Sequence, residues 1–270
     1  MTTRIIRRTV GLALALGALT LPSRAWAHGA EHDDVTLHLG DDYGSCYFDL
    51  HSDLTPVQFR KFAAEGGQLS QFRTLSSAEV LGPWVFDVAV AMTHSFIDDG
   101  DGAWNNTMSH PEEDHYLGAE VSIPLLMVRM GVTDSVDLEV SGTYDFRANY
   151  GFLGVGAKIA LLQQKLGAPV SVAIRPSVST LIGPAEVSLA SLSTELLVSR
   201  SYYHLAAFVG VGARGTIAFD SSADTNVGNQ GALRPVVLAG LEYDLEFLSL
   251  GAQVDYSTVL TLAARVGVRF

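Results

Sequence analysis

From about residue 84 to the end of the chain, apolar and polar residues alternate with a period of two. The last segment shows this most clearly, because Leu, Leu, Ala, Val, Val and Phe occupy the even positions of 260–270 while Thr, Arg and Gly lie between them. A period of two places alternate side chains on opposite faces of a β-strand. Six segments show the pattern strongly and four more weakly: 136–146, 151–162, 169–180, 204–219, 247–257 and 260–270, then 84–93, 118–132, 187–199 and 235–244.

The same alternation fits a soluble barrel with apolar residues inside or a membrane barrel with apolar residues facing lipid. Two features favour the membrane barrel. The polar faces carry charges of both signs among many glycines and serines, and aromatic residues such as Trp84, Tyr144 and Tyr256 lie near strand ends, where membrane barrels have aromatic girdles. The pattern therefore predicts an all-β, transmembrane, antiparallel up-and-down β-barrel over 84–270, with about ten strands and eight or twelve as alternatives.

The polar faces of these strands supply the charged side chains that we expect in the lumen. They are Asp137, Glu139, Asp145, Lys158, Arg175, Glu195, Arg214, Glu242, Asp255, Arg265 and Arg269. We expect Arg175, Arg214, Arg265 or Arg269 to pair with Asp137, Glu139 or Asp255 across a narrow interior. Because a proline removes a ladder hydrogen bond, irregular strand pairing is expected at Pro124 and Pro176.

The first 27 residues have the pattern of a secretory signal peptide. Arg4, Arg7 and Arg8 precede an apolar stretch over 10–21, and the small-residue site Ala25-Trp26-Ala27 predicts cleavage before His28. Residues 28–83 then form a periplasmic or lumen-docked segment.

That segment contains one predicted short helix, 56–65. Thr55 and Gln58 form a capping box, Pro56 fits the first helical position, and Gly66-Gly67 is expected to end the helix. An apolar face with Phe59 and Phe62 leads us to expect that the helix covers the periplasmic mouth of the barrel.

Charge and cysteine content exclude several other classes of protein. The 270 residues carry a net charge of −12, and the leader holds four of the 17 basic residues and none of the 29 acidic ones, so the mature chain is at −16. A nucleic-acid partner held by phosphate contacts is therefore not expected. Cys46 is the single cysteine, which excludes a disulfide within the chain.

The longest predicted outer connection, 94–117, is also the most acidic. Carboxylate oxygens and imidazoles are metal ligands, which makes this connection a candidate cation site; a solvated exposed loop is the simpler interpretation. The candidate ligands are Asp98, Asp99, Asp101, His110 and His115.

The leader, the alternating strands, turns such as 131–137 and the final stretch 265–270 resemble small, porin-like outer-membrane β-barrel proteins of Gram-negative bacteria, over roughly residues 75–270. This resemblance implies an outer-membrane location, outer-membrane lipid and the barrel-assembly machinery as partners, and no cofactor. It also implies that the terminal strand carries the assembly signal in Ala264, Val266, Val268 and Phe270.

Three functions follow from these expectations. The first is a narrow channel or small-solute transporter with a polar, ion-paired lumen. The second is a structural or surface-binding barrel that acts through the acidic connection 94–117. The third is a rim-located hydrolase using residues such as Asp98, Ser109 and His110; no residue spacing requires it, and we expect a protein that is not an enzyme.

Overall fold

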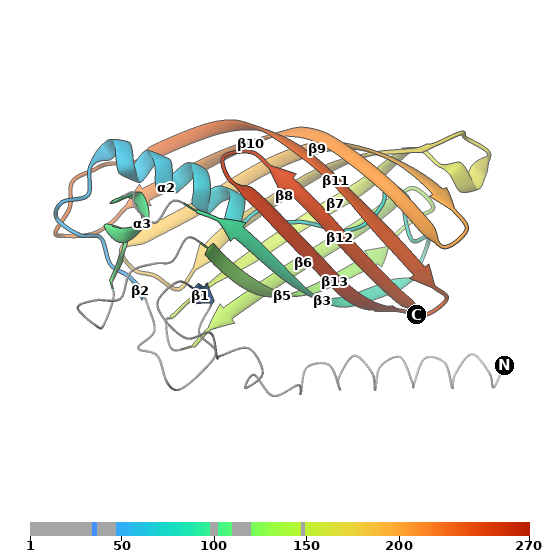
Figure 1. The fold of residues 1–270 in the computed structure, drawn as a ribbon, viewed down its shortest axis with the longest axis horizontal. Coiled ribbons are helices and arrows are strands. Elements are labelled where there is room, and N and C mark those ends of the chain that lie inside the picture. The colour runs from blue at the N-terminus through green and yellow to red at the C-terminus, as the bar shows by residue number, and fades with distance from the viewer. Residues whose placement is uncertain (1–33, 37–46, 98–101, 110–119, 147–148) are drawn as a thin grey trace.

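Ten antiparallel strands form a closed barrel in the computed structural model, which describes residues 34–36, 47–97, 102–109, 120–146 and 149–270 (Figure 1). The predicted fold class and the count of ten are therefore confirmed, whereas the predicted signal peptide lies outside the described residues. The barrel strands are β3 (Phe86–Phe96), β5 (Glu120–Gly131), β6 (Val136–Asp145), β7 (Tyr150–Leu162), β8 (Ser171–Ile182), β9 (Val187–Tyr202), β10 (Leu205–Asp220), β11 (Gln230–Leu245), β12 (Leu248–Tyr256) and β13 (Leu260–Arg269).

Each strand pairs with its neighbours along the chain, and the last strand closes the ring by pairing with the first. Residues Thr261–Arg269 of β13 align with Ser95–Asp87 of β3. Closure gives the strands partners on both sides, which a sheet in hydrocarbon requires because unpaired backbone groups cannot bind water there. No helix within the described part of the chain is long and apolar enough to cross a membrane.

The wall of the barrel is apolar outside and polar inside. On β6, Leu138 and Val140 are 48% and 45% exposed, while Asp137 and Glu139 between them are buried. On β10, Val209 and Val211 are exposed and Arg214 is buried. This distribution is the reverse of a soluble protein and is the one that a lipid environment stabilises.

Strand pairing is irregular at both prolines, as the sequence predicts. Pro124 aligns with Met92 of β3, but on its other side the β5–β6 ladder ends at the Leu126–Gly142 pair. Beside Pro176 the β7–β8 ladder is interrupted between the Gly156–Ser177 and Ile159–Ile174 pairs, and a register shift follows at residues 160–162.

Helix α2 (Pro56–Leu69) has the predicted start but not the predicted end. The Thr55–Gln58 capping box is formed. The prediction that Gly66-Gly67 ends the helix is wrong, because both glycines lie inside it and face the barrel wall. A Cβ atom on Gly67 would overlap the Thr216 side chain, so the glycine lets the helix approach β10 closely.

Helix α2 lies at the opposite end of the barrel from the one predicted. The C-terminus and the short connections mark one end, and α2 packs against β9, β10 and β11 at the other (Figure 1). Its Phe59 and Phe62 pack in one cluster with Ile97, Val227 and Val259, which belong to the long-connection end. The helix therefore covers the mouth opposite the C-terminus, whereas we expected it at the mouth where the chain ends.

Part of the predicted solvated loop 94–117 folds onto this helix. Its described residues form α3 (Gly102–Asn105) and β4 (Met108–Ser109), and β4 pairs with β2 (Tyr47–Phe48). Ala103, Trp104 and Met108 are buried, so the exposed-loop interpretation is wrong for these residues. We call α2, α3, β2 and β4 together the α2 cap. Strand β1 (Asp34–Thr36) runs parallel to the start of β5, and a short 3-10 helix, η2 (Gln164–Leu166), lies in the connection after β7.

Between α2 and β3, residues 70–82 pass through the barrel interior; we call them the lumen segment. Its side chains and backbone contact the wall from Gln71, bonded to Arg214, to Leu81, bonded to Asp137. Glycines on the wall provide the space. A Cβ atom on Gly154 would lie 2.8 Å from the Phe72 ring, and one on Gly251 would overlap the Leu75 carbonyl oxygen.

Candidate functional site

The candidate site is the interior of the barrel, where the lumen segment meets charged residues of the wall. Nearest α2, Arg73 forms a two-pronged ion pair with Asp255 of β12. Its Nε lies 2.7 Å from Oδ2 and its Nη2 lies 3.0 Å from Oδ1, and both side chains are 0% exposed. Arg73 Nη2 also donates to the Gln68 carbonyl at 2.8 Å. Such paired geometry offsets the cost of burying two charges.

A second group of contacts surrounds Phe72 and Gln71. Arg175 of β8 forms an ion pair with Glu195 of β9 and donates to the Phe72 carbonyl at 2.9 Å. Its guanidinium carbon lies 5.5 Å from the centre of the Phe72 ring, a cation–π distance. The Gln71 side chain donates to Glu195 and accepts from Arg214 Nη1 at 2.7 Å, so it connects two charged groups of the wall.

The second half of the lumen segment, which leads to β3, is bonded to the wall through its serines. Lys158 Nζ donates to Ser76 Oγ at 2.6 Å and to the Ser77 carbonyl at 2.8 Å. Arg129 donates to the same Ser76 oxygen at 2.6 Å, and the Ser77 amide donates to Glu242 at 2.8 Å. Small polar residues thus present both backbone and hydroxyl groups to the wall without filling the space that the charged side chains need.

Closer to the C-terminal end of the barrel than these serines, two acids and three arginines of the wall form one network. Asp87 lies 2.9 Å from Arg129, 2.8 Å from Arg265 and 3.2 Å from Arg269. Glu242 lies 3.6, 3.1 and 3.2 Å from the same three arginines. Since each acid faces three guanidinium groups, the network holds strands β3, β5, β11 and β13 together at the C-terminal end.

All eleven charged residues predicted for the lumen lie on the inward side of the wall, and all but Arg269, which is partly exposed, are buried. One predicted pair forms, Arg175 with Glu139, and the other two acids have different partners. Glu139 lies 4.0 Å from Arg175, but Asp137 accepts from the Leu81 amide, and Asp255 pairs with Arg73 instead of a wall arginine.

Sequence reasoning missed three charged members of the site, together with the uncharged residues of the lumen segment. Asp87 and Arg129 lie in the weakly patterned segments 84–93 and 118–132. The alternation of polar and apolar residues around them could have identified both. Arg73 lies in a stretch without periodicity, and nothing local marks it as buried.

One small cavity lies beside the lumen segment. A cavity of about 10 Å³ lies between Phe72, Asp87, Arg129, Glu139 and Arg265, which is room for about one water molecule. The Glu139 carboxylate beside it has ionic partners at 4.0 Å but accepts no hydrogen bond from the described residues.

At the other mouth, aromatic contacts hold the α2 cap together. The Phe62 ring lies edge-on to Trp104 at 5.1 Å and to Phe48 at 5.9 Å. Trp104 Nε1 donates to Glu65 at 2.6 Å, and the Leu50 amide donates to Glu186 at 3.1 Å. The cap is thus a packed unit joined to the rim of the barrel.

Two groups of predicted site residues remain, the candidate metal ligands and the assembly signal. The candidate metal ligands Asp98, Asp99, Asp101, His110 and His115 lie outside the described residues, and the residues that are described contain no group of three His, Cys, Asp or Glu able to hold a metal ion.

The predicted assembly signal lies on the strand that closes the barrel. Ala264 and Val266 face outward, Val268 is buried, and the Phe270 ring stacks on Phe86 at 6.0 Å. The backbones of Phe270 and Phe86 exchange two hydrogen bonds of 2.9 Å.

The closed sheet, the apolar outer surface and the charged interior define a β-barrel of the outer-membrane type. No protein-family model and no curated protein matches the chain. Solved structures similar to it include the attachment invasion locus protein Ail of Yersinia pestis, with 13% identity over 70% of this chain and 99% of that chain and a TM-score of 0.34.

Two Pseudomonas aeruginosa proteins give similar values. The N-terminal β-barrel domain of OprF has 13% identity over 70% of this chain and 99% of that chain, with a TM-score of 0.34. The outer membrane protein OprG has 11% identity over 72% and 99%, with a TM-score of 0.33.

Replacing Arg73 tests whether the lumen segment is part of the stable fold. Arg73→Ala leaves Asp255 without its ion-pair partner, so we expect a loss of about 3–5 kcal/mol in the free energy of unfolding. Arg200→Ala, at an exposed position on β9, is the matched control and should change it by about 0.5 kcal/mol or less. Urea unfolding of the refolded barrel in lipid measures both.

A double-mutant cycle separates the pair from general disruption. Asp255→Asn combined with Arg73→Ala should cost clearly less than the sum of the two single changes. Additive losses, or equal effects of Arg73→Ala and Arg200→Ala, would show that the pair does not form in the folded protein.

Proposed function

We propose that this protein is an outer-membrane barrel whose lumen is closed by its own N-terminal segment and which acts through the face formed by the α2 cap. This is the second of the functions predicted from the sequence, with a different active surface. The proposed active surface is the packed α2 cap, which includes part of 94–117, instead of that acidic connection alone. Outer-membrane lipid and the barrel-assembly machinery remain the proposed partners.

One observation carries the proposal: the lumen segment is bonded to the wall along its whole length. Four charged wall residues bind groups of this segment: Asp255 binds Arg73, Glu195 binds Gln71, and Lys158 and Glu242 bind the backbone of Ser77. A solute passing through the barrel would have to displace these bonds. The geometry therefore supports a closed barrel better than an open channel.

The lengths of the connections support an outward position for the α2 cap. The two longest connections between barrel strands, 97–119 and 221–229, lie at the α2 end, and two of the shortest, 203–204 and 246–247, lie at the C-terminal end. Outer-membrane barrels have short periplasmic turns and longer extracellular loops. This orientation places α2 outside and the C-terminus in the periplasm.

We also propose that the barrel works without catalysis. Two described acids around the α2 cap already serve the fold, since Glu65 binds Trp104 and Lys61 and Asp220 accepts bonds from Thr225 and the Val227 amide in its own connection. Groups engaged in this way are poorly placed to act as a general acid or base.

A narrow channel is the second candidate, and the mixed charges of the wall are the observation that favours it. Conduction would require the lumen segment to leave the barrel. Its ion pair and backbone bonds oppose that movement, because each broken contact leaves a charged wall residue without its partner.

Surface labelling tests the outward position of the cap. With Cys46→Ser as the background, Ser52→Cys places a thiol at an exposed position just before α2, and Asp134→Cys places one in a short turn at the C-terminal end. A membrane-impermeant maleimide should label Ser52→Cys on intact cells and Asp134→Cys only after the outer membrane is permeabilised. Labelling in the reverse order would overturn the proposed orientation and with it the active face.

Planar-bilayer recording tests closure of the lumen. The purified barrel should give no steady conductance, because the lumen segment is bonded to the wall along its length. Arg73→Ala, which weakens the lumen segment, should give brief openings, and Arg200→Ala should stay silent. A steady, solute-dependent conductance of the unmodified protein would favour the channel instead.

A further inference from the structure

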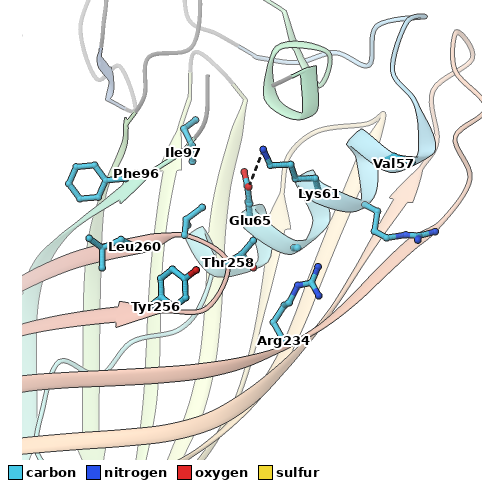
Figure 2. Close-up of a pocket in the computed structure, with 12 residues that line it drawn as sticks. Val57, Lys61, Glu65, Phe96, Ile97, Arg234, Tyr256, Thr258 and Leu260 are labelled. Atoms are coloured by element: carbon cyan, nitrogen blue, oxygen red, sulfur yellow. Dashed lines mark ion pairs between the residues drawn. The ribbon is translucent and has the colours of Figure 1, made fainter. Parts of the chain in front are cut away.

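A groove of about 690 Å³ opens at the α2 end, between α2 and the hairpin of β12 and β13 (Figure 2). We call it the mouth groove. It exists because that hairpin is shorter than its neighbour. Pairing of β11 with β12 ends at the Val237–Tyr256 pair, while β11 continues to Gln230 alongside β10. The wall therefore extends less far toward the α2 end at this point, and the groove opens toward the outer surface of the barrel as well as toward that end.

One side of the mouth groove is basic. Arg60 and Lys61 of α2 and Arg234 of β11 line it (Figure 2). Within the described part of the chain, Arg60 bonds a neutral group, Gln230, at 3.1 Å, and Arg234 forms no ion pair. Glu65 is the acid of the lining, and it already binds Lys61 at 3.7 Å and Trp104 at 2.6 Å. Among the residues that the structure describes, these two guanidinium groups therefore have no carboxylate partner, in a chain of net charge −12.

The opposite side of the mouth groove is apolar and belongs to the lipid-facing wall. Tyr256 at the end of β12 and Leu260 at the start of β13 are 54% and 41% exposed, and Phe96 ends the neighbouring strand β3. Figure 2 shows Phe96, Leu260 and Tyr256 together on one side of the groove, across from Lys61 and Arg234. Aromatic residues at strand ends mark the membrane interface in barrels of this type, so the groove joins that interface directly.

We propose that the mouth groove binds an anionic membrane lipid, with the phosphate of its headgroup against Arg60 and Arg234 and an acyl chain along Phe96, Tyr256 and Leu260. Guanidinium groups bind phosphate through paired hydrogen bonds, and basic pockets beside a lipid surface recognise anionic headgroups. A soluble anion uses the two arginines but not the apolar side. The lipid is favoured because it uses both.

This proposal deepens the proposed function, because it names a ligand of the outward face. Its place in the outer leaflet depends on the proposed orientation. Binding of lipid to the groove does not depend on the orientation of the barrel. A binding measurement on the purified full-length barrel and the surface labelling can therefore fail independently of each other.

Calorimetric titration of the barrel in a zwitterionic detergent tests the site. We expect short-chain phosphatidylglycerol to bind more tightly than phosphatidylcholine of the same chain length. Arg60→Gln with Arg234→Gln should weaken phosphatidylglycerol binding about thirtyfold, at about a tenfold change per 1.4 kcal/mol and about 1 kcal/mol per basic residue. Binding of phosphatidylcholine should not change.

Control variants separate the site from general charge. Arg200→Gln removes an exposed arginine at the opposite end and should leave both affinities unchanged, while Arg60→Lys with Arg234→Lys should retain most of the phosphatidylglycerol affinity. Heat-modifiable gel mobility confirms that each variant is folded, and the single variants are used if the double one is not.

Two results would overturn the proposal. One is equal affinity of the unmodified and Arg60→Gln/Arg234→Gln proteins for phosphatidylglycerol. The other is displacement of the lipid by inorganic phosphate at equal concentration, which would show that the groove recognises the free anion and not the lipid.

Discussion

The structure depends on pairing the charges that a narrow barrel encloses. A ten-stranded wall with apolar residues outside directs its polar residues inward, and charged groups there are removed from bulk water at a cost of several kcal/mol each unless they have partners. Wall residues satisfy part of this need among themselves, as Asp87 and Glu242 do with three arginines. Asp255 and Lys158 instead bind Arg73 and the serines of the lumen segment.

The lumen segment is therefore a structural part of the barrel and not only an obstacle in it. It gives polar groups to the wall at several heights, and wall glycines such as Gly154 and Gly251 have no side chain where it passes. The same segment joins the start of β3 to the α2 cap at the opposite mouth. Occupation of the lumen and placement of the cap thus have one physical cause, and the proposed function at the capped face rests on it.

Strand periodicity was enough to predict the barrel, its ten strands and the inward set of charges, because lipid on one side imposes a strict alternation. The capping box likewise predicted the start of α2 from local contacts. Gly66 and Gly67 misled the prediction of its end, since their role is close packing against Thr216, a contact distant in sequence. The position of α2 and the burial of Arg73 depend on the path of residues 70–82, and no local pattern encodes that path.

Disulfide trapping tests most directly whether residues 70–82 lie inside the barrel. In a Cys46→Ser background, Phe72→Cys and Gly154→Cys place two Cβ atoms about 3.2 Å apart, near the range of about 3.5–4.5 Å found in disulfides. The account predicts a cross-link within the folded barrel, seen as a mobility shift that reductant removes. Phe72→Cys with Val209→Cys, on the outer surface, should give none. Free thiols in the Phe72/Gly154 variant of a folded barrel would contradict the account.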